Sequence, residues 1–87
     1  MASVYVMAFE STHAAMASEA ALAASCAHVA MIPAPRAISA GCGMSMRFHA
    51  EDDAHASALA DVCAEAKGLA ALYREASKAD YVLVEEL

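Results

Sequence analysis

The chain has 87 residues, of which 61% are hydrophobic and 18% are charged, and its net charge is −6. This length sets one domain as the upper limit and excludes a two-lobed enzyme, while the acidic balance excludes a basic cleft for nucleic acid. The high apolar content, without a Pro, Gly or Ser tract, excludes a disordered chain. Alanine accounts for 25 residues, so the core is small and a partner or a dimer interface is expected to complete it.

The chain carries no sequence feature of a membrane or secreted protein. No segment approaches the roughly 20 apolar residues of a transmembrane helix. The N-terminus lacks a positive region, and polar residues interrupt it at positions 10–13, which does not fit a signal peptide. The number of cysteines is odd, and none are spaced as C-x-x-C: Cys26, Cys42 and Cys63. We therefore expect reduced thiols in a cytoplasmic protein that binds no membrane.

The first half of the chain predicts a strand and then a helix. Residues 3–9 are β-branched or aromatic and apolar at nearly every position, which favours a central strand. Ser11 or Thr12 can cap the following helix, and the alanine-rich stretch favours a helix to about residue 26 or 27. Few sizeable side chains are available to anchor it: Met16, Leu22 and Cys26.

Two strands and a loop are expected next. Residues 28–32 predict a strand that ends at Pro33, since proline has no N–H to donate. The segment from Pro33 to Gly43 is predicted as one loop. Residues 44–48 alternate with a period of two, and the two faces are occupied as follows: Met44, Met46 and Phe48 on one, Ser45 and Arg47 on the other.

Acidic residues at 51–53 suit the positive end of a helix dipole and predict a second helix. Its expected buried face follows helical spacing: Leu59, Val62, Cys63 and Ala66. Lys67 is assigned to the last turn and Gly68 to a left-handed stop. Residues 69–74 are ambiguous between helix and strand, and residues 81–84 predict a strand-like tail.

This order of elements, β-α-β-β-α-β and a tail, predicts an α+β ferredoxin-like sandwich. The expected sheet has four antiparallel strands with both helices on one face. We expect one domain over residues 1–87, with a core at about 3–75 and a tail at 76–87. The other face of the sheet would be open and partly apolar, and the tail or a second copy of the chain could cover it.

The charges are distributed unevenly around one cysteine. All 11 carboxylates lie at or before Glu19 or at or after Glu51. The window between them contains Arg36, Arg47 and Cys42. Nearby positive charge favours a thiolate, so the pKa of Cys42 is expected to fall below the roughly 8.5 of a free thiol.

Glycines flank this cysteine on both sides, at Gly41 and Gly43. Glycine adopts positive φ readily and has no side chain, so Cys42 can be presented to another protein's active site. The N–H groups of such a loop can also hold an anion. The alternative is a tight turn before a strand, with Arg36 and Arg47 as ordinary surface residues.

The segment IPAPRAISAGCGMSMR at residues 32–47 resembles the signature of the DUF3343 family of selenium/sulfur carrier protein-like sequences, I-P-x-P-R-x-[LI]-S-[SA]-G-C-G followed by a strand. The segment FESTHAAM at residues 9–16 is similar to the family's opening, a strand that ends in F-x-S-T-H. The resemblance spans about residues 3–75. Leu72-Tyr73 resembles the last family strand, which favours a strand at 69–74, and the tail from Ala76 extends beyond the pattern.

The resemblance implies that Cys42 is a carrier thiol that holds a persulfide or perselenide. The matched residues around it are Arg36, Ser39, Gly41 and Gly43. Arg47 is expected on the open sheet face, as an anion contact or as solvated surface. The implied partners are a donor protein, such as a cysteine desulfurase, and an acceptor protein. No metal or cofactor is needed, because thiolate exchange requires only an exposed thiol of low pKa.

Two other functions remain open. The domain could be an anion- or partner-binding module in which Arg36, Arg47 and the loop amides bind and the thiol takes no part. More weakly, Cys42 could be a redox sensor that forms a mixed or intersubunit disulfide. Cys26 and Cys63 are expected to be buried structural residues. The histidines lack H-x-x-x-H spacing, so no zinc site is expected: His13, His28, His49 and His55.

Overall fold

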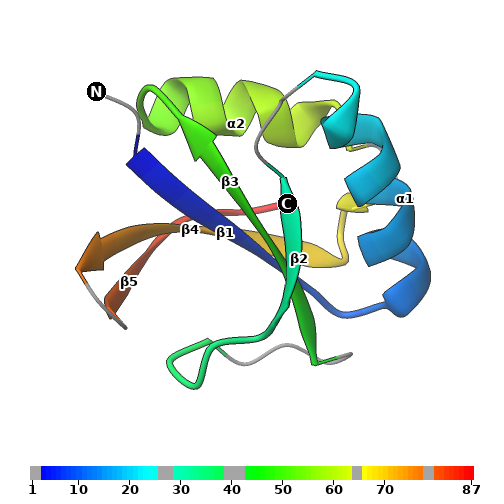
Figure 1. The fold of residues 1–87 in the computed structure, drawn as a ribbon, viewed down its shortest axis with the longest axis horizontal. Coiled ribbons are helices and arrows are strands. Elements are labelled where there is room, and N and C mark those ends of the chain that lie inside the picture. The colour runs from blue at the N-terminus through cyan, green and yellow to red at the C-terminus, as the bar shows by residue number, and fades with distance from the viewer. Residues whose placement is uncertain (1–2, 26–28, 39–42, 64–65, 78–79) are drawn as a thin grey trace.

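The computed structural model describes residues 3–25, 29–38, 43–63, 66–77 and 80–87. Seven elements follow one another along these residues (Figure 1): β1 Ser3–Phe9, α1 Thr12–Ala23, β2 Ala30–Pro33, β3 Met44–Ala50, α2 Asp53–Asp61, β4 Ala70–Ser77 and β5 Asp80–Glu86. The predicted α+β class is confirmed. The ambiguous segment at 69–74 is a strand, as the resemblance favoured.

The strands form one sheet in the order β2-β3-β1-β4-β5, and every neighbouring pair is antiparallel. The prediction of four strands is wrong, because the tail is a full fifth strand. It pairs with β4 from Ala71↔Glu86 to Ser77↔Asp80, with two register shifts between them. The tail therefore extends the edge of the sheet.

The main core lies between the sheet and both helices. Along β1, Tyr5, Met7 and Phe9 are almost fully buried and belong to this core. They share it with residues of both helices, of β3 and of β4, including Ala15, Leu22, Phe48, Ala60 and Leu72. Val6 and Ala8 alternate with them and belong to a separate small cluster. Because successive strand residues point to opposite faces, both helices cover one face, and we call the other the open face.

Helix α1 begins as predicted, but it ends early and is anchored differently. The Ser11 side chain caps it by accepting a hydrogen bond from the Ala14 N–H at 3.4 Å. Met16 is 65% exposed, so its prediction as an anchor is wrong. The buried face is made mostly of small residues, which let the helix approach the sheet closely: Ala14, Ala15, Ser18 and Leu22. The helix ends at Ala23, one residue after Leu22, its last large buried side chain. The predicted anchor Cys26 lies outside the described residues.

Strand β2 includes Pro33, one residue beyond the predicted strand of residues 28–32, which was expected to stop at this proline. Pro33 is the last residue of an edge strand and lies opposite Met44 on β3. Proline is tolerated at such a position because its missing N–H removes no interior ladder bond. The described part of the strand begins at Ala30, and residue 28 lies outside the described residues.

Helix α2 is shorter than the helical spacing predicted. It ends at Asp61, and Val62 is 45% exposed, so Val62 does not belong to the core face. After Asp61, hydrogen bonds from Cys63 N to Ala60 O and from Ala66 N to Cys63 O each span three residues. This tighter turn changes the direction of the side chains and still buries both Cys63 and Ala66. The predicted left-handed stop at Gly68 is confirmed by its φ of 78°.

Candidate functional site around the loop of residues 34–43

The loop between β2 and β3 carries the predicted carrier cysteine, and its two ends are fixed. The Ala34 N–H donates to the Gly43 carbonyl at 3.0 Å, next to the terminal strand pair Pro33↔Met44. In Figure 1 residues 34–38 of the loop lie at the end of the sheet away from α2. Three of the predicted site residues lie outside the described residues: Ser39, Gly41 and Cys42.

Gly43 has the backbone conformation that the glycine-flanked motif predicted. Its φ is 73°, in the left-handed region that L side chains rarely adopt. No atom lies within 4 Å of the position a Cβ would take, so backbone conformation and not crowding accounts for glycine here. This turn leads directly from the motif into β3.

Ile38 ties the loop to the open face of the sheet. Its side chain is 4% exposed and packs in the cluster of Val6 and Ala8 from β1. The Ile38 N–H also donates to the Pro35 carbonyl at 2.9 Å, so the loop turns back toward the sheet at this point. The motif alone did not predict a role for Ile38. The available signal was one large aliphatic residue in an otherwise small and polar stretch.

Ser45 forms a hydrogen bond to β2 next to the base of the same loop. Its side chain is fully buried and its hydroxyl donates to the Ile32 carbonyl at 3.3 Å. The sequence predicted Ser45 on the open face, opposite Met46 and Phe48, which are both in the main core. A buried hydroxyl requires a hydrogen-bond partner, and the edge strand β2 supplies it.

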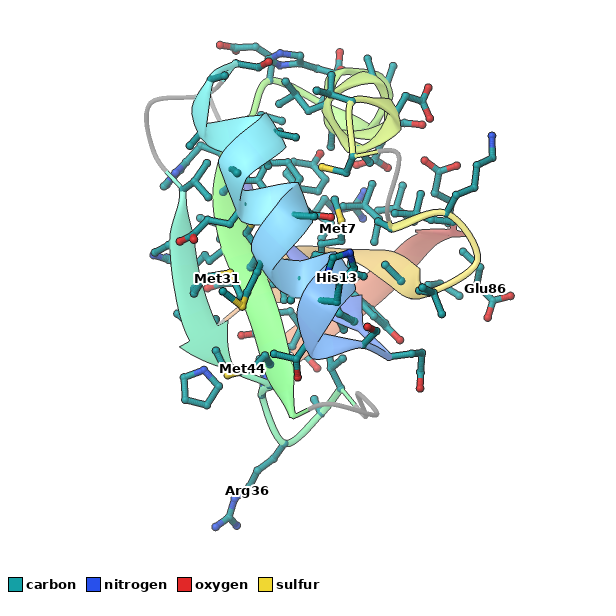
Figure 2. The ribbon with its side chains drawn as sticks, turned by 90° about the vertical axis from the view of Figure 1, so that its right-hand side faces the viewer. Met7, His13, Met31, Arg36, Met44 and Glu86 are labelled. Carbon is teal, nitrogen blue, oxygen red and sulfur yellow. The ribbon has the colours of Figure 1, made fainter. Side chains whose placement is uncertain are left out.

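Arg36 is the most outward part of the described loop. Figure 2 shows its side chain extending away from the body of the protein, and the residue is exposed. It forms no ion pair with any residue that the structure describes. Its guanidinium is therefore accessible to an external anion or carboxylate.

Arg47 lies on β3, and its side chain is 44% exposed. Its Nε is 4.0 Å from Oε2 of Glu75, which comes from β4 on the far side of β1. The run of residues without carboxylates therefore has an acidic side chain beside it in the folded protein. The two arginines differ, since Arg47 has an acidic neighbour and Arg36 points to solvent.

Cys63 is a buried thiol remote from this loop. It is 3% exposed, and its Sγ donates to the Ser18 carbonyl at 3.7 Å. Burial raises the pKa of the Cys63 thiol above its ordinary value. This confirms Cys63 as the buried residue predicted, and its thiol is poorly suited to nucleophilic chemistry.

A second polar cluster joins β1, α2 and β4. The Tyr5 hydroxyl donates to Asp53 Oδ1 at 2.7 Å, and Arg74 donates to both Asp53 carboxylate oxygens at 3.0 and 2.8 Å. These hydrogen bonds, that of Tyr5 first, hold the pKa of Asp53 below its ordinary value. Burial, and then the bond to Asp53, raises the pKa of Tyr5 to about 12. Asp53 was predicted only as a charge at a helix start, and its two partners were not predicted.

Among the described residues, no group of three His, Cys, Asp or Glu side chains is arranged to hold a metal ion. His55 has a local structural role instead, because its Nδ1 accepts a hydrogen bond from the Glu51 N–H at 3.0 Å. None of the helices in the described ranges is long and apolar enough to cross a membrane.

These features define a small α+β protein with a motif-bearing hairpin loop whose two ends are fixed and whose Ile38 packs on the open face. The family profile described as "Putative Se/S carrier protein-like" matches residues 4–74. The chain therefore belongs to this family, as its motif predicted. The search of curated proteins and the search of solved structures each gave no match.

Proposed function

We propose that this protein carries sulfur or selenium on the thiol of Cys42 and transfers it between partner proteins. The observation that carries the proposal is the loop itself. The family motif lies on a hairpin loop whose two ends meet at the bond from Ala34 to Gly43, and Ile38 of this loop packs on the face that the helices leave open. A small α+β scaffold supplies what such a carrier needs, which is a thiol and a surface for docking.

The transfer step requires no acid, base or metal from this chain. The Cys42 thiolate attacks the terminal sulfur of a donor protein's persulfide. A new S–S bond forms at Cys42, the donor's S–S bond breaks, and the donor leaves as its own thiolate. Delivery to an acceptor thiolate reverses these roles, and a perselenide follows the same scheme. Because the terminal atom passes from one thiol to another, no external oxidant or reductant is consumed.

The proposed partners are a donor that forms a persulfide, such as a cysteine desulfurase, and an acceptor protein. In this scheme the protein only accepts a sulfur or selenium atom and passes it on. We therefore propose that it acts as a carrier and not as an enzyme. A free thiol at Cys42 requires a reducing compartment, which is why we propose the cytoplasm.

A second function is favoured by Arg36 alone. An exposed guanidinium at the tip of a loop, without an ion pair among the described residues, can bind a carboxylate or phosphate in two-point geometry. In this alternative the domain binds an anion or a partner without covalent chemistry. Arg36→Ala would then abolish binding, while Cys42→Ser would leave it intact.

The deciding experiment loads the protein with a cysteine desulfurase and cysteine, followed by intact mass measurement and peptide mapping. We expect a gain of one sulfur atom, located at Cys42 and absent from Cys42→Ser. Cys63→Ser is the matched control and should load normally, because burial raises the pKa of that thiol. Equal labelling of several cysteines, or none, would contradict the carrier function. Repeating the reaction with selenocysteine distinguishes selenium from sulfur as cargo.

A further inference from the structure

The open face of the sheet carries an apolar strip on its β4–β5 side. Tyr73 and Tyr81 are half-buried and pack on the small cluster of this face. Leu83 lies directly opposite Tyr73 in the register of β4 with β5, so it shares this face, and it is 51% exposed. Both helices pack on the other face. Adjacent apolar side chains that reach solvent, in contrast to single ones, indicate an interaction surface.

A hollow of about 470 Å³ lies beside this strip, at the end of the sheet where β1 finishes. Ala8 and Ala71, which are opposite each other in the register of β1 with β4, line it together with Tyr73. Glu10 and Glu86 add two exposed carboxylates, and neither forms an ion pair with any residue in the described ranges. The hollow therefore suits an arginine, because a guanidinium pairs with carboxylates and stacks on a tyrosine ring.

Arg36 is the matching cation, but it lies at the opposite edge of the sheet. In the strand order β2-β3-β1-β4-β5, its loop leaves β2 at one edge, whereas Glu86 ends β5 at the other. Strands β1, β2 and β5 run in the same direction, so Arg36 and Glu86 are at the same end of the sheet. Figure 2 shows the two side chains at separate places on the molecule, each pointing outward. The two edges therefore carry opposite charges.

The size of the open face fits a weak, reversible interface. Five strands, spaced by about 4.8 Å and about 20 Å long, give a face of roughly 500 Å². Two such faces make roughly 1,000 Å² together, which is within the range of weak complexes between proteins.

We infer that the open faces of two copies of this chain pack against each other about a two-fold axis that runs parallel to the strands. Such an axis places β5 of one copy opposite β2 of the other and keeps the same end of both sheets together. Arg36 of each copy then faces the hollow beside Glu86 of its partner, and the two contacts are equivalent. Tyr73 and Leu83 supply the apolar part of the interface. The inference goes beyond the carrier function, since no step of it uses sulfur transfer.

The test measures the mass of the protein in solution by sedimentation velocity at increasing concentration. A reducing agent is present to exclude dimers linked by disulfides. The charge variants are Arg36→Glu, Glu86→Arg and the double variant that carries both. Glu51→Arg is the matched control, because it makes the same change of charge as Glu86→Arg at an exposed residue between β3 and α2.

We expect a concentration-dependent dimer for the unmodified protein. Each single charge variant should raise the dissociation constant of the dimer about tenfold, because two like-charged contacts replace two ion pairs. The double variant should recover the dimer. A mixture of the two single variants should form a heterodimer, because each supplies the charge that the other has lost. Glu51→Arg should stay within about twofold of the unmodified protein.

The apolar part of the interface has its own matched pair of variants. Leu83 and Val82 are both exposed on β5, but Val82 lies opposite Arg74, which bonds to Asp53 of α2 on the helix side. Leu83→Ala should raise the dissociation constant severalfold, because it removes apolar area from the interface. Val82→Ala should leave the constant within about twofold, because its side chain lies on the other face.

Four results would each overturn the inference. The first is a protein that stays monomeric up to about 1 mM. The others are a dimer that Glu86→Arg and Glu51→Arg affect equally, one that the double variant does not recover, and one that Leu83→Ala and Val82→Ala weaken equally. None of these results bears on the carrier function, which loading by the desulfurase tests separately.

Discussion

At the scale of single residues, the cluster of Tyr5, Asp53 and Arg74 shows how one carboxylate fastens three elements. Asp53 is the first residue of α2, and its partners come from β1 and β4. The Asp53 side chain is 47% exposed, so solvent screens its pairing with Arg74. The Tyr5 residue is only 1% exposed, which makes its hydroxyl the more constrained part of the cluster.

Tyr5→Phe is expected to lower the free energy of unfolding by about 1 kcal/mol at neutral pH, the usual contribution of one hydrogen bond. The pKa of Tyr5 is raised to about 12 in the folded protein, against about 10 in an unfolded chain. Its contribution is therefore complete below pH 10 and is lost as the pH rises toward 12. Urea unfolding at several pH values should show a shallower alkaline decline in Tyr5→Phe. An identical decline in both proteins would contradict this assignment.

The residues of the site show what a sequence pattern can and cannot predict. Gly43 was predictable because its requirement for positive φ is local. The ion pair of Arg47 with Glu75 was not, because the two residues are 28 positions apart and meet only across β1. The burial of Ile38 likewise depends on where the loop packs. Motif residues can be identified from the sequence, whereas the residues that support them are set by tertiary contacts.

At the scale of elements, the two helices differ in how well their first turns are capped. Asp52 accepts from the His55 N–H at 2.8 Å, whereas Ser11 accepts from the Ala14 N–H at 3.4 Å. Hydrogen bonds weaken with distance, and the charged Asp52 also suits the positive end of the helix dipole.

Asp52→Ala is therefore expected to destabilise the protein by about 1 kcal/mol, and Ser11→Ala by about 0.5 kcal/mol, within the range of N-cap substitutions. Thermal or urea unfolding of the two variants gives the comparison. A larger loss for Ser11→Ala would contradict the order of the two caps.

The ends of the elements were predicted less well than their existence. The strand alternation of residues 44–48 identified β3 and its two faces, because a period of two is a strong local signal. The spacing of Leu59, Val62 and Cys63 predicted a longer α2 than the structure has. After Asp61 the chain forms a tighter turn, and Cys63 is buried against α1. A tertiary contact of this kind produces no periodic pattern of apolar residues in the sequence.

At the scale of the whole molecule, β5 belongs to the folded core although it lies beyond the family match. Val84 and Leu87 pack against the main core. The Leu87 N–H donates to Ala70 O, and its carbonyl accepts from the Gly68 N–H, both at 2.9 Å. The end of the chain is therefore fastened to both sides of the turn that precedes β4.

Val84→Ala is expected to lower the free energy of unfolding by about 1 kcal/mol through lost core contact. Val82→Ala is the matched control on the same strand, and as a 43% exposed residue it should change stability by less than about 0.5 kcal/mol. Urea midpoints at an unchanged slope would measure both. Equal, negligible effects would indicate that β5 unfolds separately from the rest.

The two faces of the sheet contribute unequally to the buried apolar core. Among the residues that the structure describes, fourteen buried residues form the core on the helix side, and three form the cluster on the open face. Substitutions on the open face can therefore change that surface while most of the buried apolar contacts stay intact. The same strands therefore have one surface that stability constrains tightly and another that can change at little cost to the free energy of unfolding.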